Sequence, residues 1–147
     1  MELRELLDGA SDMAADVFYE VGEIEPTWIA ENVDGLVMVL RTPFTDADIS
    51  KDIVVRSMRK LFKERNVVRY VFVSEAWIVE FKDHMDAGRP SQHPDRREII
   101  MLRGEDINGD VIGATRYILR PEVGKPKLTE LKIDEGEFSG RFTGMFK

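Results

Sequence analysis

The residues that could carry chemistry gather in one polar stretch and at the ends of the two apolar runs beside it, within residues 67–103. The first run reads VVRYVFVSEAWIVEF, the polar stretch reads KDHMDAGRPSQHPDR, and the second run reads REIIMLR. Long loops beside rigid strands often carry functional residues. The side chains here that suit acid–base chemistry or ligand binding are Glu75, Trp77, His93, Asp95, Arg96, Arg97 and Glu98.

A histidine beside a carboxylate can act as a general base, and a neighbouring arginine can hold an anionic group. The catalytic candidates in this pattern are Glu75, His93 and Asp95, and the ligand-binding candidates are Trp77, Arg96 and Arg97. Two simpler interpretations compete with catalysis: Glu75 forms a cross-strand ion pair with an arginine, and His93 is an exposed loop residue. No HExxH, GxSxG, Walker or GxGxxG motif occurs, so no catalytic residue is assigned.

The same polar stretch holds the chain's two histidines and several carboxylates that could bind a metal ion. These residues are Asp83, His84, Asp86, His93 and Asp95. Their spacing matches no established ligand pattern. Residues 106–110 resemble the opening of a calcium loop, but a hairpin turn explains their Asn-Gly pair better. We therefore expect no metal site and no cofactor.

Two amphipathic helices are predicted to support this stretch. Residues 2–21 carry apolar side chains at three- and four-residue spacing, with acidic side chains on the opposite face. A second helix begins near Thr45, a good N-cap, and runs to about Arg65. Its exposed face carries a basic stripe of Arg56, Arg59, Lys60 and Lys63. Both charged stripes are interpreted first as solvated faces. The alternative for the acidic stripe is a surface for a basic partner, and the alternative for the basic stripe is nucleic-acid binding.

The remaining elements read as strands. The predicted strands are 27–32, 36–41, 67–81, 98–103, 111–119 and 128–133, with Asp34-Gly35 and Asn108-Gly109 as hairpin turns. Strand 67–81 is apolar in both alternating sets, so both of its faces are expected to be covered. The order α-β-β-α-β-β-β-β predicts a single α+β domain over residues 1–147, with a mainly antiparallel sheet of about six strands and both helices on one face.

The C-terminal tail, residues 134–147, is rich in glycine and contains Phe138, Phe142 and Phe146. Aromatic side chains of this size are costly to leave in water. We expect the tail to pack on its own domain, with packing on a partner subunit as the alternative. Because the second face of the sheet needs a cover, a homo-oligomer is also expected.

Composition limits the functional classes. The net charge is −7, and residues 1–50 hold two basic and twelve acidic residues, so nucleic acid is a poor candidate partner. Cysteine is absent, the N-terminus lacks the pattern of a signal peptide, and no apolar run approaches the roughly 18 residues of a membrane span. A cytoplasmic protein is therefore expected.

Two functional hypotheses result from the sequence. The first is a non-enzymatic binding or interaction module whose partner, a protein or a small molecule, the sequence does not identify. The alternative is a small hydrolase-like acid–base enzyme that uses Glu75, His93 and Asp95, with Arg96 or Arg97 binding an anionic group. The absence of a recognisable catalytic motif favours the first.

Overall fold

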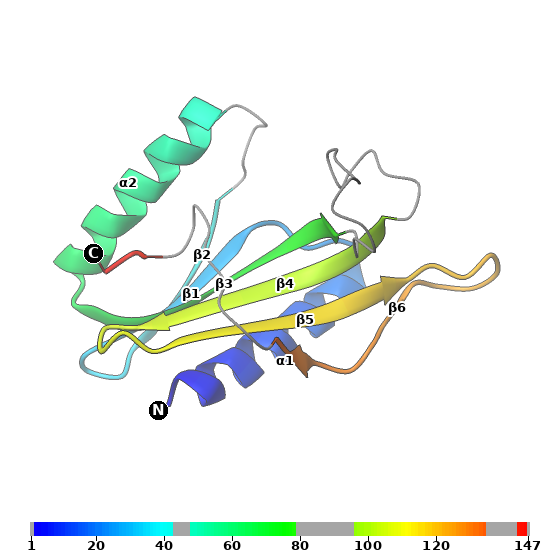
Figure 1. The fold of residues 1–147 in the computed structure, drawn as a ribbon, viewed down its shortest axis with the longest axis horizontal. Helices are drawn as coiled ribbons and strands as arrows, with labels where there is room; N and C mark the ends of the chain where they lie inside the picture. The colour runs from blue at the N-terminus through cyan, green and yellow to red at the C-terminus, as the bar shows by residue number, and fades with distance from the viewer. Residues whose placement is uncertain (1, 43–47, 79–95, 135–143, 147) are drawn as a thin grey trace, which may run out of the picture.

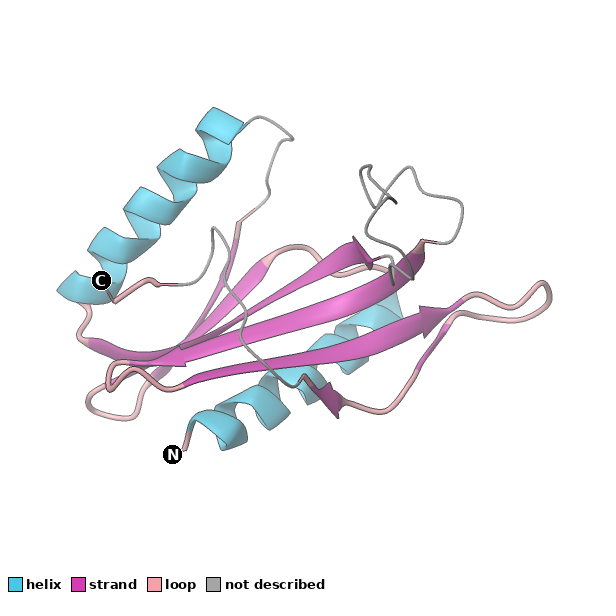
Figure 2. Ribbon diagram, in the orientation of Figure 1, coloured by secondary structure: helices cyan, strands magenta, loops and turns pink. Residues whose placement is uncertain are grey.

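The described residues form one antiparallel sheet and two long helices (Figures 1 and 2). The computed structural model describes residues 2–42, 48–78, 96–134 and 144–146. The helices are α1 (Leu3–Val21) and α2 (Asp48–Glu64), and the strands are β1 (Thr27–Asn32), β2 (Val37–Arg41), β3 (Val67–Ile78), β4 (Arg97–Asp106), β5 (Val111–Leu119), β6 (Lys127–Leu128) and β7 (Lys132–Ile133). The predicted α+β class and element order are confirmed.

The strands lie in the order β2-β1-β3-β4-β5-β6, and β7 pairs with β5. Each strand pair is antiparallel, which agrees with the hairpin signals in the sequence. Gly35 and Gly109 have φ angles of 85° and 98°, as the hairpin turns require. β4 continues to Asp106, beyond its predicted end. The final predicted strand is divided into β6 and β7.

The two helices pack on opposite faces of the sheet, so the prediction that both lie on one face is wrong. Val71 and Val73 of β3 belong to the core beneath α1, whereas Tyr70 and Phe72 belong to the core beneath α2. In the view of Figure 1, α1 passes behind the strands. Since alternate residues of a strand point to opposite faces, the two apolar sets of β3 each receive one helix.

Val67 departs from the predicted alternation. The sequence places it with Val71, but it packs in the α2 core with Tyr70. The pairing of β1 with β3 shifts between Glu31 and Asn32, so one residue of β3 has no opposite partner. A bulge of this kind reverses the alternation of the residues beyond it, and a sequence pattern with period two misses this shift.

Helix α1 is held at both ends and covers its core with an apolar face. Glu2 and Glu5 form a capping box at its start, and Gly22 ends it in the left-handed conformation at φ 93°. Leu7 and Phe18 are fully or almost fully buried. Near the N-terminal end, Leu3 Cδ1 would lie 3.2 Å from a Cβ added at Gly104. The missing side chain there allows close packing of α1 on β4.

The second face is covered by α2 and by the end of the chain. Met58 and Phe62 of α2 are buried against Tyr70, and Phe146 packs on the same rings, 5.6 Å from Tyr70 between centroids. Met145 is buried, and its N–H donates to Glu105 over 2.9 Å. The tail residues 135–143, including Phe138 and Phe142, lie outside the described residues. The described end of the chain thus packs on its own sheet.

Candidate functional site

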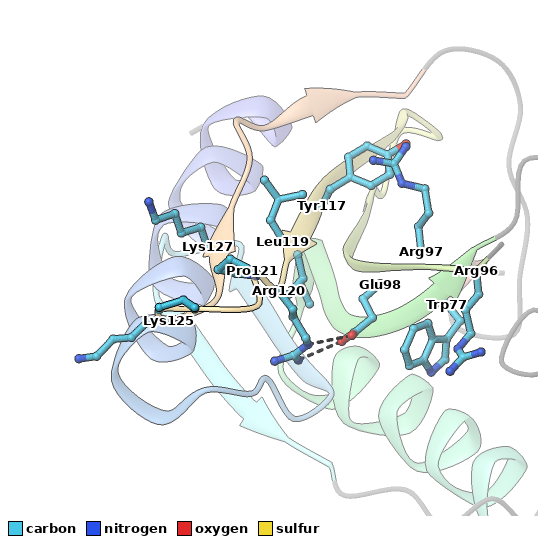
Figure 3. Close-up of a pocket in the computed structure, with 13 residues that line it drawn as sticks. Trp77, Arg96, Arg97, Glu98, Tyr117, Leu119, Arg120, Pro121, Lys125 and Lys127 are labelled. Carbon is cyan, nitrogen blue, oxygen red and sulfur yellow. Dashed lines mark hydrogen bonds and ion pairs between the residues drawn. The ribbon is translucent and has the colours of Figure 1, made fainter. Parts of the chain in front are cut away.

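A cavity of about 620 Å³ lies at the end of the sheet where β3 and β5 finish and β4 begins (Figure 3). It is lined by Trp77, Arg96, Arg97, Glu98, Tyr117, Ile118, Leu119, Arg120, Pro121, Val123, Gly124, Lys125 and Lys127. The connection between β5 and β6 projects beyond the rest of the sheet in Figure 2 and supplies one wall. Strand ends and a loop therefore build the cavity together.

Two of the lining arginines stack on aromatic rings. The guanidinium carbon of Arg96 lies 4.8 Å from the ring centroid of Trp77, and that of Arg97 lies 4.1 Å from the ring centroid of Tyr117. Both distances fall within the range of cation–π attraction. A stacked guanidinium keeps its edge N–H groups directed away from the ring, and these groups can bind a carboxylate or phosphate side-on.

A third arginine is neutralised within the site. Arg120 donates from Nε and Nη2 to the two carboxylate oxygens of Glu98, over 2.8 and 2.9 Å, as the dashed lines in Figure 3 show. The hydrogen bonds to Glu98 raise the pKa of Arg120 above its ordinary value. This paired geometry fixes both side chains beside the cavity.

The lining spans both faces of the sheet. Tyr117 pairs in register with Ile99, and Ile100 with Arg116. Because Ile100 packs in the α1 core and faces alternate along a strand, Tyr117 lies on the α2 face. The same alternation places Arg97 with Tyr117, and the Glu98–Arg120 pair on the α1 face. The cavity thus extends around the strand ends rather than lying on one flat surface.

Glu75 does not line this cavity. Its Oε1 accepts a hydrogen bond from the N–H of Ile24 over 3.0 Å. Burial raises the pKa of Glu75, while the Ile24 hydrogen bond and the charge of Arg120 oppose the rise. In register Glu75 is opposite Ile100, and Arg97 is opposite Ile78. The predicted partnership of Glu75 with a cross-strand arginine is therefore replaced, among the described residues, by a backbone partner.

The structure brings together the three predicted ligand-binding residues, Trp77, Arg96 and Arg97, in one lining. His93 and Asp95 lie outside the described residues, as do Asp83, His84 and Asp86, so their predicted roles stay predictions. Within the described residues no group of three potential metal ligands occurs. Sequence reasoning missed Tyr117, Arg120, Lys125 and Lys127. The clustering of two lysines and two prolines in residues 121–127 is the one signal that pointed to this wall.

The basic stripe of α2 faces solvent elsewhere on the molecule. Arg59, Lys60 and Lys63 line a separate hollow of about 650 Å³, together with Phe146. Lys60 lies 3.9 Å from Glu64, a weak exposed pair. Among the described helices, none is both long enough and apolar enough to cross a bilayer.

Comparison with known proteins identifies no relative. No protein-family model, curated protein or solved structure matches this chain. The fold and the cavity are therefore the basis for a functional proposal.

Proposed function

We propose that this protein is a non-enzymatic binding module whose cavity at the sheet end holds a small anionic ligand. One observation carries the proposal: among the described residues, the lining contains five cationic side chains and a single carboxylate. The cations are Arg96, Arg97, Arg120, Lys125 and Lys127, and the carboxylate is Glu98. In a chain of net charge −7, such a concentration of positive charge attracts anions to this place and repels cations.

The lining also favours an apolar or aromatic part in the ligand. Trp77 is 39% exposed and Leu119 is 47% exposed, and both contribute to the wall. Ligand sites commonly combine such apolar surface with a few polar groups that set orientation. The rings of Trp77 and Tyr117 hold Arg96 and Arg97 in place before a ligand arrives, which lowers the entropic cost of binding.

Tryptophan fluorescence provides a direct test. The chain has two tryptophans; Trp28 is fully buried and Trp77 is 39% exposed, so iodide quenches Trp77 selectively. The probes are inorganic phosphate and phenyl phosphate, with phenol as the uncharged control. We expect both anions to protect Trp77 from iodide, phenyl phosphate at lower concentration, and phenol to have no effect. Equal protection by phenol would contradict an anion site.

Substitution of one stacked arginine sharpens the test. Arg97→Gln should weaken phenyl phosphate binding by about tenfold, since it removes a charged donor from the cavity. Arg65→Gln, which changes an exposed arginine just after α2, is the matched control and should leave binding unchanged. Equal affinities of the two variants for phenyl phosphate would show that Arg97 does not contribute to the site.

The alternative, a hydrolase-like acid–base enzyme, is supported by one observation: burial raises the pKa of Glu75, as a general acid or base near neutral pH requires. The hydrogen bond from Ile24 occupies one oxygen of Glu75, and the cavity lining does not include it. The binding module is therefore the preferred proposal. Turnover of 4-nitrophenyl phosphate or 4-nitrophenyl acetate that disappears in Glu75→Gln would favour the enzyme instead.

For location and assembly, we propose the cytoplasm, supported by the absence of cysteine. The homodimer was expected because one face of β3 needed a cover. That face is covered by α2 together with Met145 and Phe146, so this reason for a dimer no longer holds. Light scattering at high protein concentration measures the oligomeric state directly.

A further inference from the structure

A second surface lies at the opposite edge of the sheet, along β2. No strand of the described residues pairs with the outer side of β2. The N–H of Asn32 donates to the carbonyl of Leu36 over 2.9 Å, so every second residue from Leu36 exchanges hydrogen bonds with β1. The backbone N–H and C=O groups of Val37, Val39 and Arg41 therefore point outward. An edge of this kind can accept an additional strand.

The side chains of this edge form one wall of an apolar groove. Val37 and Val39 are 46% and 50% exposed, and they lie on the same face as Ile29, which packs beneath α1. Two hollows of about 260 Å³ each continue along α1 and share Met13 in their linings. Natural edge strands are usually protected by lysine, proline or a bulge, and residues 37–40 of β2 contain none of these.

Gly9 opens the groove on its helical side. It lies in the interior of α1, where glycine costs roughly 0.5–1 kcal/mol of stability relative to alanine. It lines the same hollow as Val37 and Val39. A Cβ at this position would meet no atom within 4 Å. Packing against the described residues therefore does not require glycine here, whereas a segment lying in the groove would come close to this helix backbone.

The rim of the groove is acidic. Glu5 lines one end, and Glu20, Glu23 and Glu25 line the other, and Arg41 is the single cation among the described residues that line the two hollows. A second copy of this chain would bring two such rims together and is disfavoured by charge repulsion. A segment with basic residues on both sides of an apolar centre matches the groove in charge and in polarity.

We propose that the groove between β2 and α1 binds an extended, basic-flanked apolar peptide segment of a partner protein. The segment extends the sheet by pairing with the outward groups of Val37 and Val39. Its alternate apolar side chains lie over Met13 and Gly9, and its Lys or Arg residues reach the glutamates at the two ends. This surface is separate from the cavity near β5 and does not depend on the anion ligand.

The test uses labelled synthetic peptides and the full chain. The probe has the sequence KKVTVTVKK, the charge control has EEVTVTVEE, and a third peptide carries N-methyl groups on alternate residues of the basic sequence. Fluorescence anisotropy should show binding of the basic peptide only, with affinity falling as salt rises. N-methylation should weaken binding by about tenfold or more, since it removes the pairing N–H groups.

A proline in the edge strand β2 distinguishes a loss of peptide pairing from a loss of the folded structure. Because the N–H of Val39 points away from β1, Val39→Pro leaves the β1 ladder intact, as edge prolines do. It should keep the far-ultraviolet circular dichroism of the parent and lose peptide binding. If the proline variant is poorly folded, Val39→Lys replaces it in the test. The lysine repels the basic probe without changing the backbone, so this variant should also lose peptide binding. Ile107→Lys, at an exposed position in the β4–β5 turn, is the control and should bind normally.

Three outcomes would overturn the proposal. The basic peptide fails to bind at millimolar concentration, the acidic peptide binds equally well, or the chain forms a dimer that Val39→Lys dissociates. The last result would assign the groove to a second copy. The fluorescence test of anion binding at Trp77 does not depend on peptide binding, so the anion-site proposal and the peptide-groove proposal can each fail alone.

Discussion

Arg120 and Glu98 form a two-pronged ion pair, with nitrogen–oxygen distances of 2.8 and 2.9 Å, at the wall of a cavity lined by four other cationic side chains. Glu98 thus occupies the guanidinium group that an anionic ligand would otherwise bind. The pair holds Arg120 beside the cavity but reduces its charge, so under the proposed function Glu98 would compete with an anionic ligand for this guanidinium group.

Glu98→Gln should therefore tighten anion binding. The amide keeps a similar shape but lacks the negative charge, and the affinity for phenyl phosphate should rise by about threefold to tenfold, as measured by protection of Trp77 from iodide. Glu130→Gln gives the same change in net charge at an exposed residue and should have little effect. A weaker affinity in Glu98→Gln would mean that the positioning of Arg120 matters more than its neutralisation.

The raised pKa of Glu75 predicts a pH-dependent difference in stability. Burial makes the folded protein hold this proton more tightly than the unfolded chain, whose pKa is near 4.5. Ionised Glu75 therefore lowers folding stability above its folded pKa, and this cost disappears as the pH falls through that pKa toward 4.5. Glu75→Gln should be more stable than the parent at neutral pH, with the difference vanishing in acid.

Urea unfolding of both proteins over this pH range measures the difference. Glu122→Gln, at an exposed position in the β5–β6 connection, is the control for the loss of a carboxylate. A parent that is more stable than Glu75→Gln at neutral pH would show that the ionised carboxylate is stabilised through Ile24 and Arg120.

Tyr70 should make the fold sensitive to alkaline pH. Its hydroxyl donates to Glu105, and burial, followed by the hydrogen bond and the charge of Glu105, raises its pKa above 10.0. Above about pH 10 the unfolded chain loses this proton while the folded protein keeps it, so stability falls by about 1.4 kcal/mol per pH unit from this group. Tyr70→Phe should lower stability by about 1–2 kcal/mol at pH 8 and reduce the alkaline loss.

Denaturant unfolding from about pH 8 to about pH 11 checks this expectation. Tyr117→Phe, which removes a tyrosine hydroxyl from β5, is the matched control. If the free energies of unfolding of Tyr70→Phe and of the parent fall with the same slope as the pH rises, the phenol of Tyr70 ionises in the folded state.

Two glycines should respond to alanine in opposite directions. A Cβ at Gly104 would lie 3.0 Å from Ile112 Cγ2 and 3.3 Å from the carbonyl oxygen of Tyr70, so Gly104→Ala should cost about 1–3 kcal/mol by overpacking. A Cβ at Gly9 would meet nothing within 4 Å, so Gly9→Ala should stabilise α1 by about 0.5–1 kcal/mol. Thermal unfolding of both variants measures the two effects, and equal signs would contradict the packing described for Gly104.

The elements of this fold were predictable, but their arrangement was not. Helical spacing and the Asp-Gly and Asn-Gly turns were enough to locate the helices and hairpins. The apolar stripe of a helix shows which of its own faces is buried, but not which face of the sheet it covers. The two apolar sets of β3, which include Val73 and Phe72 respectively, did show that both faces needed a cover. Assigning α2 to the second face required the three-dimensional path of the chain.

The candidate site was only partly predictable for a related reason. Trp77, Arg96 and Arg97 lie close to one another in the pairing of β3 with β4, and the sequence grouped them. Arg120 and Tyr117 reach the same cavity through the pairing of β4 with β5, and both lie outside residues 67–103, the stretch in which the sequence grouped its candidates. The partner of Glu75 is the backbone of Ile24, a contact between residues distant in sequence that no residue type indicates.

Strand β3 lies between the two hydrophobic cores, and this position affects how fast its backbone amides exchange with solvent. Val71 and Phe72 lie in its paired central part, one in the core beneath each helix, so we expect their amides to become exposed only through large-scale opening of the fold. Deuterium should therefore enter these amides last, at a rate set by global unfolding, while β2 exchanges much earlier through local opening.

Because α1 packs on strands far along the chain, folding requires long-range closure and should be slower than in helical bundles of similar size.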